Sequence, residues 1–443
     1  MRIHKAFLVV GCLLTLAMGL GDLSARTTSN AIEDLKSPDP KLRAKAAREL
    51  AKHGTPADVP ALAAAINDPE AKVRREVVVA LASIHAAESL DPLIAATRDE
   101  DFKIRALAIE NLVNYYAGQS GSRGFVGFWK NTWNKAKGHF VRDDFKIDPG
   151  IQVEPRVVAA LVAALNNPEA IEPCRRAAKG LGVLLARDAV PDLIKGAHAM
   201  DEETALESLN SLTKIQELSA GPPLLDLLDS PSDEVRLEAA VVVGLLRTQE
   251  AVPKLQTIYE KGANKRTQVK SLEGLAYIGS PASVPIFSKA LWSSDKTIRA
   301  LAAEGLGRAG DEKALPDLEK AVNAEKDAEP RFAMMFGITG LGRMDYLSDL
   351  VNGLGSRFRG DVVQSYLIEL SRKPDLRDRL YPFLNSHDSD VRRRLCTVLM
   401  YNGDAASIEH LERLSGDPKN DVATEALRAL RVVRMRAAAK PAL

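Results

Sequence analysis

Aromatic side chains and cysteines are scarce in this chain, and neither sign of charge dominates. Phe, Trp and Tyr together make up 5% of the 443 residues, and there are three cysteines. With 60 Lys and Arg against 59 Asp and Glu, the formal net charge is +1. The cysteine count excludes a disulfide-dense scaffold. A balanced charge supplies no long-range field toward nucleic acid, so we expect no nucleic-acid partner.

Patterns that carry catalysis or metal binding are also missing from the sequence. It contains no His-Glu pair, no Cys-x-x-Cys, no His-Glu-x-x-His and no phosphate-binding P-loop. Two Gly-x-Gly triplets, at 305–307 and 340–342, have no strand before them, and we predict that both are packing glycines inside helices. We therefore expect no enzyme, no catalytic or metal-binding residue and no cofactor.

The N-terminus resembles a secretory signal. Arg2 and Lys5 precede an almost wholly apolar run over residues 6–21, which matches a basic segment followed by a short hydrophobic one. We predict a signal peptide over residues 1–25 and a periplasmic or secreted protein. A membrane-anchored signal is the alternative, and Cys12 offers a weaker lipoprotein reading.

A leucine recurs along the chain with a period of about 31 residues. Such a period means that one supersecondary unit is copied many times, which predicts a solenoid. Val243 fills the one position in the series that lacks leucine. The members are Leu50, Leu81, Leu112, Leu181, Leu212, Leu275, Leu306, Leu341, Leu370, Leu399 and Leu430.

Each unit fits two helices. The first begins near an arginine that lies seven residues before the recurring leucine, and the second opens with proline, which a first helical turn tolerates. The first helices begin with segments such as 39–43, 70–74, 101–105, 295–299 and 388–392. The prolines are Pro60, Pro92, Pro191, Pro253, Pro285 and Pro316.

Helix pairs with Asp-x-x-Val-Arg openings and Val-Pro-x-Leu second helices resemble HEAT repeats, and the short period is similar to that of the phycobilisome-lyase type. The resemblance covers roughly residues 30–436. It implies an all-α, right-handed α-solenoid of about twelve HEAT-like units. The units would occupy residues 26–116 and 154–436, with a tail at 437–443.

Local features of the repeat carry further predictions. We expect Gly54, Gly279, Gly310 and Gly403, each four residues past the leucine, to end first helices in the left-handed conformation. Aspartates should cap helix starts, and the recurring arginines should reach neighbouring units. Cys174 and Cys396 should be buried and too far apart for a disulfide.

The repeat is interrupted at residues 117–153, where aromatic and basic residues gather. Placed on a helix, the aromatic residues between Phe125 and Phe140 share one face. Such a face could pack onto the solenoid, dock in a partner's groove or meet a membrane surface. The candidate partner-binding residues are Phe125, Phe128, Trp129, Lys130, Trp133 and Lys137.

These patterns favour an exported, non-enzymatic scaffold that binds a protein or peptide along a solenoid groove. The alternative is a HEAT-like lyase or cofactor-handling protein that uses the insertion as a lid over a pocket.

Overall fold

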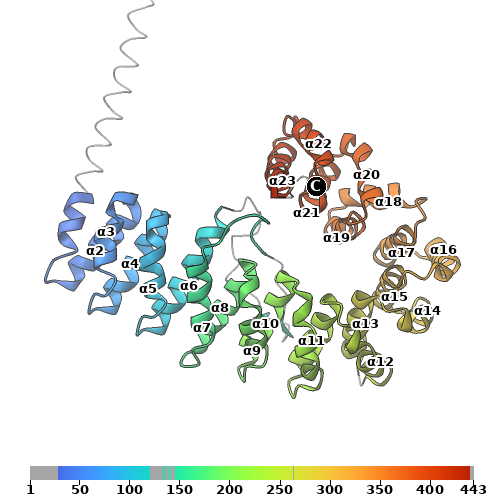
Figure 1. Cartoon of the computed structure of the whole chain (residues 1–443), viewed down its shortest axis with the longest axis horizontal. Helices are drawn as coiled ribbons and strands as arrows, with labels where there is room; N and C mark the ends of the chain where they lie inside the picture. The colour runs from blue at the N-terminus through green and yellow to red at the C-terminus, as the bar shows by residue number, and fades with distance from the viewer. Residues whose placement is uncertain (1–27, 120–132, 135–138, 141–144, 263, 440–443) are drawn as a thin grey trace, which may run out of the picture. The chain divides into compact units, whose positions relative to one another are not determined.

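The computed structural model describes residues 28–119, 133–134, 139–140, 145–262 and 264–439 (Figure 1). The predicted signal peptide at 1–25 lies outside the described residues. The chain divides into two compact units. Of the described residues, unit 1 holds 28–119 and 153–196, and unit 2 holds the two short strands, 145–152 and 197–439.

Unit 1 is a row of helix pairs that follows a helical stretch at residues 28–34. Its first helices are α2 (Pro40–His53), α4 (Ala71–Ile84), α6 (Phe102–Ala117) and α8 (Ile171–Val183). Its second helices are α3 (Val59–Ala64), α5 (Leu90–Ala96), α7 (Pro155–Leu165) and α9 (Val190–Ala197).

Unit 2 continues the same pattern. Its first helices are α10 (Glu202–Ile215), α11 (Asp233–Leu245), α13 (Lys265–Ile278), α15 (Lys296–Ala309), α17 (Ala328–Gly340), α19 (Gly360–Leu370), α21 (Ser389–Asn402) and α23 (Asn420–Ala439). Its second helices are the 3-10 helix η5 (Pro222–Asp229), α12 (Val252–Lys261), α14 (Val284–Ala290), α16 (Leu315–Ala324), α18 (Leu347–Asn352), α20 (Pro374–Asp378) and α22 (Ala406–Leu414). In Figure 1 the first helices of unit 2 lie on the inner side of its curved row of repeats, and the second helices lie on the outer side.

The predicted all-α solenoid is confirmed. Four helix pairs in unit 1, seven in unit 2 and the single helix α23 come close to the predicted twelve units, counted over the part of the chain that the structure describes. All eleven recurring leucines and Val243 are buried. The recurring leucine thus marks the apolar face that each unit packs against its neighbours.

The predicted left-handed caps are right at two glycines and wrong at two. Gly279 and Gly310 have φ values of 63° and 73°. Gly54 and Gly403 are extended, with φ near −66° and −61°. At these two positions a Cβ atom would overlap the carbonyl oxygen four residues earlier. Glycine is therefore needed there because a side chain has no room, and not because φ is positive.

Close helix packing explains the first Gly-x-Gly triplet but not the second. A Cβ on Gly307 would lie 2.5 Å from Gly337 Cα of α17, so Gly307 is a packing glycine as predicted. α17 ends at Gly340, however, and Gly342 has φ 98° with nothing near its missing side chain. The prediction that this second triplet lies inside a helix is therefore wrong, because Gly342 forms the turn after the helix.

The repeated arginines form a ladder of ion pairs, as predicted. Arg74 donates from Nε to Asp99 at 2.7 Å and from Nη1 to the Asp68 carbonyl at 2.9 Å. The Arg74 guanidinium thus joins the turn before α4 to the turn after α5. The same arrangement holds in Arg43–Asp68, Arg299–Glu325 and Arg392–Asp417.

The helical placement considered for the aromatic residues does not hold at residues 133–134 and 139–140, which are strands. β1 (Trp133–Asn134) and β2 (His139–Phe140) form a short antiparallel pair, in which Trp133 is opposite Phe140. The sequence here contains Gly138, and glycine lowers helix propensity.

Neither described cysteine forms a disulfide. Cys174 and Cys396 are free and buried, as predicted. Burial raises the pKa of the Cys396 thiol to about 12, which leaves it unreactive. Among the described residues, no helix combines the length and the apolar character needed to span a membrane.

Candidate functional site

The first helices of unit 2 run in the same direction, so their equivalent ends gather. At the N-terminal ends, Arg266 of α13 pairs with Glu234 of α11. At the C-terminal ends, Arg308 of α15 donates to the Ala276 carbonyl of α13 at 3.3 Å. A similar contact joins α21 to α19, where Asn402 Nδ2 donates to the Ile368 carbonyl at 2.5 Å.

A cavity of about 1410 Å³ lies among these helices. Its wall comes from α10, α11, α13, α15, α19, α21 and α23, with Lys146 added from the segment before α7. Cations outnumber carboxylates on this wall. The cations are Lys146, Lys214, Arg247, Arg266, Lys270, Arg308, Arg372, Arg393, Arg394 and Arg428, and the acids are Glu234, Glu238, Glu273, Glu304, Asp361, Glu369, Asp421 and Glu425.

Glu369 is the centre of a charge network on the cavity wall. Both of its carboxylate oxygens accept from Arg308 Nε at 3.0 Å, and Arg247 Nη2 lies 3.5 Å away. Arg247 follows α11 and Glu369 lies on α19, so the network joins repeats that are 122 positions apart in the sequence. The network therefore fixes the two sides of the cavity wall to each other.

Arg308 is held from several sides. Its side chain is 9% exposed and also pairs with Glu304 at 2.9 Å. The guanidinium stacks over the Tyr277 and Phe336 rings at 5.0 and 5.1 Å. Tyr366 donates its hydroxyl to Glu304 at 2.6 Å, and burial together with the nearby Glu304 charge raises the pKa of Tyr366 well above its ordinary value. This side of the wall is thus preorganised.

Residues 145–150, which we call the strap, contribute Lys146 to the cavity wall. Ile147 is 1% exposed, Asp148 pairs with Arg428 of α23, and Lys146 Nζ lies 5.4 Å from the centre of the Tyr401 ring of α21. The paired Asp148 and Glu425 raise the pKa of Arg428 above its ordinary value although burial opposes them. The strap places Lys146 on the cavity wall through contacts with helices that lie far along the sequence.

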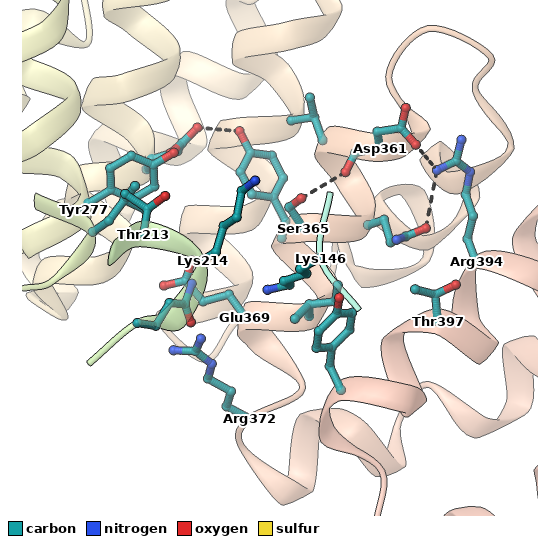
Figure 2. Close-up of a pocket in the computed structure, with 18 of the residues that line it drawn as sticks. Lys146, Thr213, Lys214, Tyr277, Asp361, Ser365, Glu369, Arg372, Arg394 and Thr397 are labelled. Carbon is teal, nitrogen blue, oxygen red and sulfur yellow. Dashed lines mark hydrogen bonds and ion pairs between the residues drawn. The ribbon is translucent and has the colours of Figure 1, made fainter. Parts of the chain in front are cut away.

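The N-terminal ends of the first helices carry charges that neutralise one another. Arg394 of α21 pairs with Asp361 of α19 at 2.5 Å. Arg393 lies 3.9 Å from Asp421 of α23. In Figure 2, Asp361 and Arg394 lie toward one end of the cavity, Lys214, Glu369 and Arg372 lie toward the other, and Lys146 lies between them.

The structure does not place the predicted partner-binding side chains. Phe125, Phe128, Trp129, Lys130 and Lys137 lie outside the described residues. Trp133 is described only as a strand residue of β1. The role of these residues stays a prediction.

The cavity was missed by the sequence reasoning. Its lining residues lie on the same helix faces in successive repeats, which sequence periodicity could have grouped. Their assembly into one chamber depends on the curvature of unit 2 and on the strap. Neither can be read from a single repeat.

The described residues offer no built metal site, since none of them form a group of three or more potential His, Cys, Asp or Glu ligands. The charged groups of the cavity pair mostly with each other.

Comparison with protein families identifies the repeat. The model of HEAT repeats matches residues 28–113, 158–244, 190–266 and 252–336, which together make up more than half of the chain. The chain therefore belongs to the HEAT-repeat family. No curated protein matches it.

The solved structures that match this chain have low sequence identity to it. Importin beta is 13% identical with a TM-score of 0.44, over 98% of this chain and 67% of its own. An engineered protein is 18% identical with a TM-score of 0.40, over 92% and 99%. The complex of CpcE and CpcF of phycocyanin lyase from Nostoc sp. PCC7120 is 20% identical with a TM-score of 0.33, over 57% and 94%.

Proposed function

We propose that this protein is an exported, non-enzymatic scaffold that holds an extended segment of another polypeptide in the cavity of unit 2. The single observation that carries the proposal is the cavity of about 1410 Å³ among the first helices. This volume exceeds the range of roughly 300–1,000 Å³ that is typical of small-molecule sites. HEAT-type arrays offer extended concave surfaces to partners.

The composition of the wall also supports a polypeptide ligand. Apolar side chains such as Leu218 and Val362 are more than 40% exposed beside the charged ones. A peptide presents main-chain polar groups together with side chains of both kinds, and it can satisfy a mixed wall of this sort. Main-chain groups would pair with polar residues such as Ser365 and Thr397.

Export is the second part of the proposal and rests on the basic and apolar pattern of residues 2–21. Expression of the full chain in a bacterium, followed by N-terminal sequencing of the mature protein, tests it. Cleavage near residues 21–25 and recovery in the periplasm or medium are expected. A cytoplasmic protein that retains Met1 would contradict export.

The cavity is tested by blocking it. Peptides of about ten residues are selected from a displayed random library on the purified chain and measured by fluorescence polarisation. Ser365→Trp, on the cavity wall, should weaken binding of the selected peptides at least tenfold. Ser348→Trp, at an exposed position of α18 outside the cavity, is the matched control and should leave binding unchanged. Peptides that bind Ser365→Trp as tightly as the original chain would refute the cavity as the binding site.

The predicted contribution of the insertion has its own test. We propose that the candidate residues between Phe125 and Lys137 add contacts to the same partner. Replacing Trp129 and Lys130 with alanine should weaken binding of the selected peptides and leave the circular dichroism spectrum unchanged. Unaltered binding would assign these residues to packing alone.

A further inference from the structure

The strap is a non-helical segment of this chain that lies against first helices of unit 2 and belongs to no repeat. Lys146 Nζ lies 5.4 Å from the centre of the Tyr401 ring of α21, and Asp148 pairs with Arg428 of α23. Ile147, between them in sequence, is 1% exposed. The strap thus offers a cation, an aliphatic side chain and a carboxylate in succession.

Asp148 is a polar anchor of the strap. Its carboxylate accepts from Arg428 Nε at 2.9 and 2.8 Å and also from Arg428 Nη2. The Asp148 side chain is 7% exposed. A charge-assisted contact of this kind between a guanidinium and a carboxylate is strong and directional. The α23 helix therefore recognises a carboxylate at this position of the strap.

Helix contacts that do not involve the strap organise the site around Arg428. Arg428 Nη1 donates to both Glu425 oxygens at 3.3 Å, and Thr397 of α21 donates its hydroxyl to Glu425 at 2.7 Å. Arg436 Nη2 also joins α23 to α21, since it donates to the Met400 carbonyl at 2.7 Å. Arg428 should therefore keep its orientation when the strap leaves. A preorganised site of this kind binds a replacement segment with less loss of conformational entropy.

The strap ends in a tight turn. Ile151 N donates to the Asp148 carbonyl at 3.2 Å, and Gly150 between them has φ 105°. Proline followed by a glycine of positive φ, as in Pro149 and Gly150, is typical of a type II turn. Residues 145–154 belong to no helix or strand. A segment outside the regular elements can open locally while the repeats stay folded.

We propose that the strap is a displaceable occupant of the cavity wall, and that the partner segment which replaces it carries an aliphatic residue followed directly by aspartate. This inference rests on the proposed function and names the sequence class of the partner and its competitor within the chain. Lys146 lies between the two ends of the cavity in Figure 2, so a peptide that fills the cavity meets the strap. Ile147 and Asp148 mark the two positions that the partner takes over.

Competition with a built-in occupant has a measurable consequence. The apparent affinity for a partner is reduced in proportion to the fraction of molecules in which the site is open. Weakening the strap without changing the helices that receive it should therefore tighten binding. A strap that serves only as a structural brace makes a different prediction. Loss of its contacts would then change stability and would not let the same segment bind from solution.

The test uses the full chain and a fluorescein-labelled peptide with the sequence of residues 145–152, measured by fluorescence polarisation. Ile147→Ala combined with Asp148→Asn gives the opened chain, which should bind the peptide at least about tenfold more tightly than the original chain does. The matched control, Ile171→Ala with Asp349→Asn, makes the same changes at exposed positions outside the cavity and should leave binding unchanged. Circular dichroism verifies that both variants stay folded.

The aspartate contact is tested in the opened chain with Arg428→Gln. This substitution should weaken binding of the labelled peptide about tenfold or more. It should also remove the preference of the opened chain for this peptide over the same peptide carrying Asp148→Asn. Arg431→Gln, at an exposed position of the same helix, is the control and should preserve the preference. A purely structural effect on α23 would weaken both peptides equally, and a preference that survives Arg428→Gln would contradict the proposed contact.

Selection of displayed random peptides on the opened chain tests the class of partner. The selected sequences should be enriched in an aliphatic residue followed directly by aspartate, and they should compete with the labelled strap peptide. Selected peptides that lack this pair, or that bind together with the strap peptide, would overturn the inference. A strap-dependent dimer in sedimentation velocity would assign the site to a second copy of the chain and would overturn it too.

Two outcomes separate this inference from the function on which it rests. If Ser365→Trp abolishes binding of the library-selected peptides while the opened chain binds the strap peptide no better than the original chain, the strap is a fixed brace and the cavity remains the binding site. If Ser365→Trp has no effect on any selected peptide, the proposed function fails, and the inference falls with it.

Discussion

At the scale of single residues, the ladder arginines join one repeat to the next. Arg392 donates to Asp417 at 2.8 and 3.0 Å and to the Ser386 carbonyl at 2.7 Å. These contacts hold the pKa of the Asp417 carboxyl below its ordinary value. The folded state therefore favours the charged carboxylate more than the unfolded chain does.

The sign of this pKa shift fixes a pH dependence. A carboxyl whose pKa is depressed by folding stabilises the protein fully above its unfolded pKa, which is about 4 for aspartate. That contribution is lost as the pH falls through the lower, folded value. Arg392→Gln should therefore lower the urea midpoint at pH 7, and its difference from the original chain should shrink below about pH 4.

The measurement is urea unfolding followed by circular dichroism between pH 7 and pH 2.5. Arg379→Gln, at an exposed site, is the control and should track the original chain throughout. A difference that stays constant down to the lowest pH would show that the Arg392 pair does not depend on the Asp417 charge.

The ladder was predictable from sequence, whereas some caps were not. The regular spacing of arginine and acid follows from the copied unit. Left-handed positions, by contrast, fall on His85 and Gln216, with φ of 53° and 56°. No glycine marks them, because the penalty for a single non-glycine residue in this conformation, about 1–2 kcal/mol, is small against the packing of a repeat.

Among helices, close approach is the feature that sets the spacing of the array. A Cβ on Gly337 of α17 would lie 2.8 Å from the Ala303 carbonyl of α15, too close for a real side chain. Gly340 in the same helix has only ordinary contacts, at 3.7 Å. A side chain therefore fits at Gly340 but not at Gly337.

This difference predicts opposite effects of the same substitution. Gly337→Ala should force α15 and α17 apart and destabilise unit 2 by about 2–3 kcal/mol. Gly340→Ala should be neutral or stabilising by up to about 1 kcal/mol, since alanine is the better helix former. Thermal unfolding followed at 222 nm measures both. Equal effects from both substitutions would mean that the helices can separate freely at this point.

The strap is an element that no repeat pattern announces. Ile147 is buried and Ile151 N donates to the Asp148 carbonyl at 3.2 Å. Ile147→Ala should lower the opening free energy of the strap by about 2 kcal/mol. Exchange of the Ile151 amide should then be roughly thirtyfold faster.

Hydrogen exchange with mass spectrometry measures the strap directly. Ile171→Ala makes the same change at a side chain that is 56% exposed, so it should leave the Ile151 amide unchanged. Slow exchange in both variants would show that Asp148 and Arg428 hold the strap without Ile147.

Across the molecule, the sequence predicts the array but not its long-range contacts. A repeat protein in which each unit touches only its neighbours loses structure one repeat at a time. The helices, the buried leucines and the ladder all follow from that local rule and were predictable. The cavity depends on contacts such as Arg247–Glu369 and Asp148–Arg428, which join distant repeats and leave no periodic signal.

These long-range contacts predict coupled unfolding within unit 2. Glu369→Gln removes the carboxylate that Arg247 and Arg308 share and leaves the largely buried Arg308 with Glu304 alone. Protection from hydrogen exchange should fall together in α11, α15 and α19, whereas a nearest-neighbour array would lose it in α19 and the adjacent helices first. Glu412→Gln, which breaks an exposed pair with Arg434, should change only local exchange. Loss of protection confined to α19 would show that the Glu369 network does not couple distant repeats.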